Sequence, residues 1–145
     1  MDLKKKRIVE TVSELLKILR LKRISETKFV GQNYPASWGR VFGGQILAQS
    51  LHAAYQTVPN TRIAHSLHGY FILMGDINLP VEYEVDKIRD GNSFTTRRVV
   101  AYQNGKAIFN MAASFQKEEN GVDHQIDAPN ILPPEVLRSD MQQVE

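Results

Sequence analysis

The feature that most constrains this fold is an uncharged stretch that runs from Val41 to Pro59. It opens with two glycines, continues in good helix formers and stops at a proline. Its apolar and small residues recur at helical spacing and extend nearly all the way round: Ile46, Leu47, Ser50, Leu51, Ala53, Ala54 and Val58. A helix without charge along its length is normally enclosed by other parts of the protein. We therefore predict a central helix that the rest of the chain surrounds.

Beyond this helix the period of the sequence changes from helical to extended. Within residues 81–88, apolar Val81, Tyr83 and Val85 alternate with acidic side chains at 82, 84 and 86, as in a strand with one buried face. Asp90–Gly91–Asn92 and Asn104–Gly105 indicate hairpin turns, because Gly and Asn accept the positive φ that tight hairpins require. These patterns and the residue types predict strands over 23–30, 62–74, 81–88, 93–103 and 106–117.

Two terminal segments flank this unit. Residues 118–145 are polar and contain prolines, which predicts a tail or linker. A meander of long antiparallel strands after one uncharged helix suggests a sheet curled round that helix. We therefore predict an α+β hot-dog fold for residues 1–117, a curved antiparallel sheet wrapped around a long central helix. An extra amphipathic N-terminal helix is expected over 8–21, with these residues on its apolar face: Ile8, Val12, Leu15, Leu16 and Leu19.

Composition excludes several classes of function. At 145 residues the chain is long enough for one domain with a substantial core. The absence of cysteine excludes disulfides, thiolate nucleophiles and cysteine metal sites. A formal net charge of +2 is too small to indicate a nucleic-acid partner, and no apolar run is long enough to span a bilayer. These observations fit a cytoplasmic protein, or a peroxisomal one if the source is eukaryotic, with neither nucleic-acid nor membrane partners.

The start of the predicted helix is the first candidate site. Gly43–Gly44 places bare backbone N–H groups at the positive end of a long helix, where they can hold an anion or a developing oxyanion. A glycine also lets a ligand carbonyl approach the backbone closely. The alternative is that both glycines only permit a tight turn from loop into helix. The residues alone leave these two interpretations equal.

Histidines and basic residues form a second group of candidates. His65 and His68 lie three residues apart on one predicted strand, so we expect them on opposite faces of the sheet, where they cannot jointly bind a metal. One of them would face the helix and a cleft, and the alternative for each is a hydrogen-bonded structural histidine. Four basic residues on the hairpin strands would either meet a phosphate or form a solvated face: Arg89, Arg97, Arg98 and Lys106.

An absence is equally informative. No Asp or Glu occurs between Glu26 and Asp76, so the predicted helix and its flanking loops carry no general base of the carboxylate type. No serine lies in a nucleophile signature such as Gly-x-Ser-x-Gly. If hydrolysis takes place at this site, the group that activates water must come from elsewhere.

Three segments together resemble one known family. The segments VFGGQILAQSLHAA, AHSLHGYFILMGD and IRDGNSFTTRRVVAYQNGKAIFNMAASFQ are similar to the first half of the type II acyl-CoA thioesterases, the TesB-like family. The similarity spans roughly Leu15 to Gln116. It implies the hot-dog fold, hydrolysis of fatty acyl-CoA to a free acid and CoA, and no metal or organic cofactor.

The resemblance also implies a division of labour. In that family two hot-dog units share one polypeptide, and the water-activating aspartate, with a hydroxyl residue and a glutamine, belongs to the second unit. No residue here inherits those three roles. This half would offer Gly43, Gly44 and Gln45 for substrate binding and the oxyanion, with Gly44 as the favoured donor, and His65 as a candidate catalytic residue. The implied partners are acyl-CoA and a second hot-dog unit, in the same chain or through self-association.

Two other functions stay open on the sequence. A non-catalytic acyl-thioester-binding or dimerisation module would bind an acyl-CoA analogue without turnover. A hot-dog hydratase or dehydratase would pair a histidine with a carboxylate near the helix, which the carboxylate-free interval disfavours.

Overall fold

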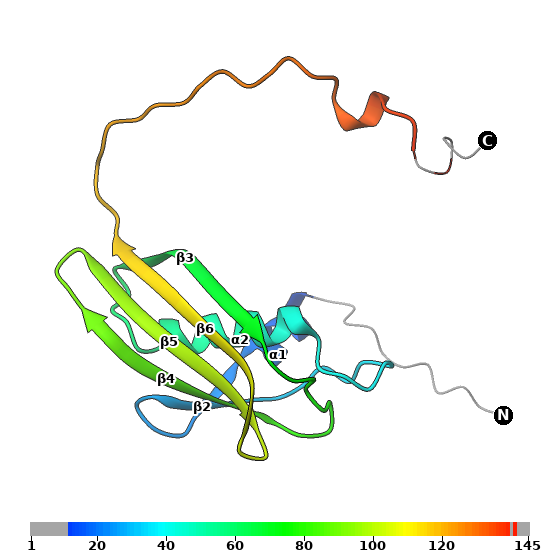
Figure 1. The fold of residues 1–145 in the computed structure, drawn as a ribbon, viewed down its shortest axis with the longest axis vertical. Coiled ribbons are helices and arrows are strands. Elements are labelled where there is room, and N and C mark those ends of the chain that lie inside the picture. The colour runs from blue at the N-terminus through cyan, green and yellow to red at the C-terminus, as the bar shows by residue number, and fades with distance from the viewer. Residues whose placement is uncertain (1–11, 140, 142–145) are drawn as a thin grey trace.

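The computed structural model describes residues 12–139 and 141, and its order of elements follows the predicted one closely (Figure 1). The helices and strands are α1 (Val12–Leu19), β1 (Leu21–Arg23), β2 (Lys28–Gly31), α2 (Gly43–Tyr55), β3 (Arg62–Phe71), β4 (Val81–Asp90), β5 (Phe94–Gln103) and β6 (Lys106–Lys117). Residues 8–11 of the predicted first helix lie outside the described residues.

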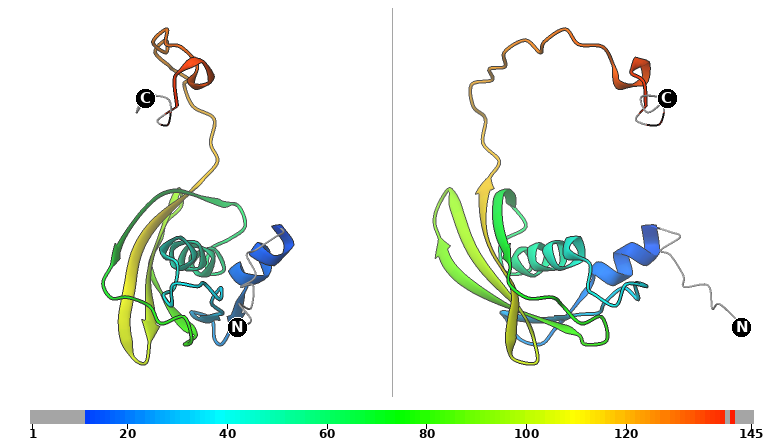
Figure 2. Two further views of the ribbon diagram at one scale, coloured as in Figure 1. Left: turned by 90° about the vertical axis from the view of Figure 1, so that its right-hand side faces the viewer. Right: turned by 45° about the vertical axis from the view of Figure 1, so that its right-hand side comes forward.

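The strands form one antiparallel sheet that curves round α2 (Figures 1 and 2). Alternate residues of the central strands face the helix and are fully buried: Tyr83, Val85, Val99, Ala101, Phe109, Met111 and Phe115. From α2, Ile46, Ala53 and Ala54 meet this face, and the two alanines let helix and sheet approach closely. The predicted hot-dog fold is therefore confirmed.

The helix α2 is less enclosed than its sequence predicted. Its buried residues lie on the side of the sheet, whereas Leu47, Ala48 and Leu51 are only half-buried. The helix α1 lies along this outer flank (Figure 2) and buries none of its own residues completely. The uncharged helix α2 is thus covered completely by the sheet on one side and only partly by α1 on the other.

The strand order differs from a four-strand meander. The order in the sheet is β1-β2-β4-β5-β6-β3, so β3 pairs with β6 and forms one edge, and of the last four strands only β4, β5 and β6 are neighbours in chain order. The predicted strand over 23–30 is also interrupted. The Ser25 hydroxyl accepts the N–H groups of Thr27 (3.3 Å) and Lys28 (3.1 Å), which closes a turn between β1 and β2.

Both predicted hairpin turns are present, but they use different geometry. Asn104 and Gly105 adopt positive φ values of 48° and 71°, as predicted. Gly91 does not have positive φ. Glycine is required there for another reason, because a Cβ at this position would lie 2.8 Å from the carbonyl oxygen of Phe94. Arg62 holds the turn by donating to the carbonyl oxygens of Gly91, Asn92 and Ser93.

Beyond β6 the chain leaves the sheet (Figure 1). Residues 118–133 have no regular secondary structure, and one short 3₁₀ helix follows at Pro134–Val136. The apolar residues of this segment are exposed: Val122, Ile126, Ile131, Leu132, Val136 and Leu137. None of the helices in the described part of the chain has the length and apolar character needed to cross a lipid bilayer.

One buried hydroxyl gives a stability prediction. Ser50 of α2 is fully buried, and its Oγ has no hydrogen-bond partner among the described residues. A buried polar atom without a partner costs free energy. We expect Ser50→Ala to raise the free energy of unfolding by about 1 kcal/mol, measured by urea denaturation. Ser66→Ala, at an exposed position of β3, is the control and should change stability by less than about 0.5 kcal/mol. A destabilised Ser50→Ala protein would contradict the prediction.

Candidate functional site

The site begins at the uncapped start of α2. Phe42 precedes the helix in an extended conformation (φ −68°, ψ 127°) and provides no side-chain cap. Its carbonyl accepts the N–H groups of Gln45 (3.0 Å) and Ile46 (3.3 Å). Within the described residues, the N–H groups of Gly43 and Gly44 donate no hydrogen bond. Two unpaired donors therefore lie at the positive end of a 13-residue helix.

The two glycines also make room for aromatic rings. A Cβ on Gly43 would lie 3.1 Å from the ring of Phe71, and a Cβ on Gly44 would lie 2.5 Å from the ring of Phe42. Both rings are mostly exposed, Phe42 at 59% and Phe71 at 61%. The two sequence interpretations are therefore compatible, because glycine permits the packing of each ring while the backbone donors stay unpaired.

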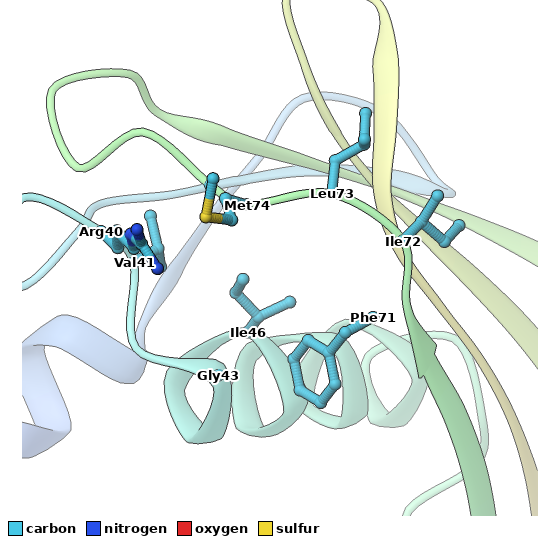
Figure 3. Close-up of a pocket in the computed structure, with 9 residues that line it drawn as sticks. Arg40, Val41, Gly43, Ile46, Phe71, Ile72, Leu73 and Met74 are labelled. Carbon is cyan, nitrogen blue, oxygen red and sulfur yellow. The ribbon is translucent and has the colours of Figure 1, made fainter.

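A cavity of about 340 Å³ lies on the Gly43 side of the helix start (Figure 3). Ile46 and Phe71 border it from α2 and the end of β3, and Met74 lies opposite them on the segment that follows β3. Arg40 supplies the single charged side chain among the described residues that line it. This cavity opens beside the β3 edge of the sheet.

A second cavity, of about 450 Å³, lies on the Gly44 side between α2 and α1. Its walls are Leu15, Ile18 and Leu19 of α1, Gln45 and Ala48 of α2, and Tyr34, Trp38 and Phe42 of the preceding loop. None of these described lining residues is charged. The start of α2 is thus flanked by two mostly apolar cavities, and of their described lining residues only Arg40, in the first cavity, is charged.

Gln45 lies at the helix start as predicted, but its side chain is turned to the protein. Its Oε1 accepts the N–H of Tyr34 at 3.0 Å, and its Nε2 donates to the carbonyl oxygen of Gln32 at 3.1 Å. These bonds hold the loop that carries Tyr34, one wall of the second cavity. The geometry gives the Gln45 amide a positioning role.

One turn further on, Gln49 joins three parts of the fold. Its Nε2 donates to the carbonyl oxygens of Ile18 (2.7 Å) and Gln32 (3.1 Å), and its Oε1 accepts the hydroxyl of Tyr83 at 2.6 Å. Burial raises the pKa of Tyr83 far above its ordinary value, so the hydroxyl stays protonated and donates. Sequence reasoning missed this residue. The sequence did offer one indication of its role, because Gln49 lies one helical turn after Gln45 in a stretch without charged residues.

The histidine prediction is wrong about the faces of the sheet. A bulge between Ala64 and Ser66 shifts the alternation of β3 by one residue. His65 Nε2 therefore lies 2.8 Å from Ser114 Oγ, and His68 pairs with Ala112. Ser114 and Ala112 alternate with the buried residues of β6, so both histidines lie on the convex face, away from α2. A catalytic role for His65 stays a prediction.

The basic residues do not form one common surface. Arg97 is 1% exposed and donates to Asp90 Oδ1 at 2.6 Å and to the carbonyl oxygen of Thr57 at 2.9 Å. It is neither a solvated residue nor a free phosphate ligand, so both sequence alternatives are wrong for it. Arg98 lies on the exposed face and pairs with Asp86.

The carboxylate-free interval ends at the rim of the first cavity. A backbone bridge joins Arg40 to Asp76, and the N–H of Val41 donates to the carbonyl of Gly75 at 3.0 Å. Asp76 Oδ1 accepts both the N–H and the side-chain amide of Asn78, each at 2.9 Å. This carboxylate is therefore engaged in its own turn. Among the described residues, no cluster of three or more histidine, aspartate or glutamate side chains is arranged to hold a metal ion.

Comparison with known proteins gives consistent matches. Residues 34–116 match the family described as "Acyl-CoA thioesterase N-terminal domain". The chain is 39% identical over 126 residues to "Acyl-CoA thioesterase 2" of Haemophilus influenzae, covering 87% of this chain and 44% of that protein. It is 44% identical over 121 residues to human "Acyl-coenzyme A thioesterase 8", covering 83% of this chain and 38% of that protein.

A solved structure agrees with the sequence matches. The tesB protein of Mycobacterium avium subsp. paratuberculosis superimposes with a TM-score of 0.75 at 37% identity, covering 88% of this chain and 50% of that one. The chain thus spans about half the length, or less, of these relatives.

Proposed function

The chain belongs to the acyl-CoA thioesterase family, and from this premise we propose that it is the N-terminal half of a double hot-dog enzyme that hydrolyses fatty acyl-CoA to a free fatty acid and CoA. In this proposal residues 1–117 form the first hot-dog unit, and residues 118–145 lead toward a second unit. The observation that carries the proposal is the pair of unpaired backbone donors at Gly43 and Gly44, placed between two apolar cavities.

The mechanism proposed is direct hydrolysis by an activated water. The water attacks the thioester carbonyl, and the carbonyl oxygen gains negative charge as the tetrahedral intermediate forms. N–H groups at the start of α2 stabilise this charge, because they are fixed in place and unpaired before the substrate arrives. The described carboxylate at this rim, Asp76, is held in its own turn, so the acid that activates the water is proposed to come from the second unit.

The edge strand β3 supports the position proposed for that second unit. One side of β3 pairs with β6, and the other side is unpaired in the sheet. Large apolar side chains are exposed along this strand and just after it: Ile63, Leu67, Tyr70, Phe71, Ile72, Leu73 and Met74. A long apolar edge is a surface that recruits another strand. A second unit that pairs here would lie beside the Gly43 cavity and complete its open side.

The proposed oxyanion donors are testable by removing single N–H groups. Proline is tolerated in the first helical turn and lacks this donor. For Gly43→Pro, the preceding residue Phe42 already has the extended conformation that a residue before proline requires; for Gly44→Pro, the preceding residue Gly43 is helical but has no Cβ to clash with the proline ring. In the assembled enzyme we expect Gly43→Pro or Gly44→Pro to lower kcat for palmitoyl-CoA by about 10²–10³-fold, with the larger loss at Gly44.

Alanine at the same positions is the matched control. Gly43→Ala and Gly44→Ala add the same Cβ against the Phe71 and Phe42 rings but keep the N–H. We expect each alanine variant to retain kcat within a few-fold of the parent enzyme. Equal kcat in the proline and alanine variants, with intact folding by circular dichroism, would refute the oxyanion role.

A non-catalytic acyl-thioester-binding module is the second candidate. The positioning of Gln45 favours it, because that side chain shapes a cavity and does not point at a reacting group. This alternative would be favoured if acyl-CoA bound both to this chain alone and to the chain joined to a second hot-dog unit, and neither form hydrolysed it.

A further inference from the structure

The two cavities at the helix start match the two arms of a thioester. From its carbonyl carbon an acyl-CoA extends an uncharged hydrocarbon chain on one side and, through sulfur, a pantetheine arm with an anionic nucleotide on the other. The Gly43 cavity includes the cation Arg40, whereas the described lining of the Gly44 cavity has no charged side chain. Charge complementarity therefore directs the hydrocarbon chain to the Gly44 side.

The width of the Gly44 cavity is set by two contacts between the helices. Gln49 of α2 donates to the carbonyl oxygen of Ile18 at 2.7 Å, and the Nδ1–H of His52 donates to that of Leu19 at 2.9 Å. Both accepting groups are at the C-terminal end of α1, where carbonyls lack helical partners. α1 is thus held against α2 at one end, and the apolar cavity lies along the pair.

The size of the cavity is suited to a small ligand or a hydrocarbon chain. Its volume of about 450 Å³ lies in the range of small-molecule sites.

We propose that the cavity between α1 and α2 holds the acyl chain of the substrate, with α1 and the Trp38 ring as its outer wall. The inference rests on the proposed function and adds the acyl-binding surface and the residues that select chain length. Leu15 of α1 and Ala48 of α2 both line this cavity, so substitutions at these two positions test whether the acyl chain binds there.

The experiment uses the sole tryptophan as its reporter. Trp38 lines the cavity and is 59% exposed, so a chain bound beside it should shift its emission to the blue. The probes are the non-hydrolysable thioethers S-ethyl-CoA and S-dodecyl-CoA, titrated below the micelle concentration. Each fully buried methylene contributes about fourfold in affinity, so we expect at least about 100-fold tighter binding of the dodecyl probe.

Two pairs of variants locate the bound chain. We expect Leu15→Glu to weaken S-dodecyl-CoA binding by at least about tenfold, because a charge is then placed in the apolar wall. Val12→Glu is the control, since Val12 is exposed on the same helix and lines no described cavity. Ala48→Phe fills the cavity from α2 and should have a similar effect, while Ala112→Phe, exposed on the convex face, should not.

The outcomes separate this inference from the proposed function. A dodecyl-dependent shift of Trp38 emission that Leu15→Glu and Ala48→Phe abolish supports the inference. Calorimetric binding of S-dodecyl-CoA without a Trp38 shift, or with unchanged affinity in both variants, would overturn it and leave the thioesterase proposal intact. Absence of binding by either probe would also overturn it, whereas the proposed function is judged separately by turnover of the proline and alanine variants.

Discussion

Palmitoyl-CoA hydrolysis by this chain alone is expected to be about 10²–10⁴-fold slower than by the chain joined to a second hot-dog unit, the range that a missing general base would explain. The helix start offers N–H donors, and among the described residues the carboxylate at its rim, Asp76, is held in its own turn through Oδ1, which accepts two hydrogen bonds from Asn78. The second unit would be taken from the part of the Haemophilus influenzae relative that this chain does not match. Release of free CoA, followed with a thiol reagent, measures the rate.

Two controls decide how that result is interpreted. The second unit alone must hydrolyse palmitoyl-CoA more slowly than the joined protein does. Equal rates would show that this chain contributes nothing to catalysis. Turnover by this chain alone at the rate of the joined protein would contradict the proposed division between halves. In that case a homodimer would hold the complete site, and His65→Ala and Gln45→Ala would test whether its catalytic groups come from this chain.

The largest loss of stability is expected from Arg97→Met. The buried guanidinium bonds to Asp90, to the side chain and carbonyl of Thr57, and to the carbonyls of Arg89 and Thr96. It therefore ties the end of α2 to the β4–β5 hairpin. Methionine has a similar length but no donors, so these acceptors lose their partner. Asp90 is more than half exposed, so the main cost is the loss of donors to the Thr57, Arg89 and Thr96 acceptors, and we expect the free energy of unfolding to fall by about 1–3 kcal/mol, measured by urea denaturation.

The neighbouring arginine provides the matched control. Arg98 is on the same strand but lies on the exposed face, where it pairs with Asp86. Exposed ion pairs contribute little, so Arg98→Met should cost less than about 1 kcal/mol. Equal losses in the two variants would show that burial of Arg97 does not determine its contribution.

Much of the fold was predictable from local pattern. The boundaries of β6 and the Asn104–Gly105 turn follow directly from alternation and turn chemistry, because both depend on residues close in sequence. The same holds for α2, whose glycine start and lack of charge indicated a central helix. The candidate donors at Gly43 and Gly44 were predictable for this reason, since an unpaired N–H is a property of every helix start.

Other features depend on which distant segments meet. The bulge that turns His65 away from α2 exists only in the pairing of β3 with β6, and no period within β3 reveals it. Arg97 is buried because Thr57 and the β4–β5 hairpin close over it, which a local pattern of charge cannot show.

The sequence by itself therefore determined most of the elements, the central helix and the two glycines at its start, because short-range periodicity and backbone chemistry specify them. Only the tertiary structure decided which faces the histidines and arginines occupy, and that two cavities of different charge flank Gly43 and Gly44. The physical reason is that a side chain's surroundings are set by strand register and by helix contacts between residues far apart in the chain.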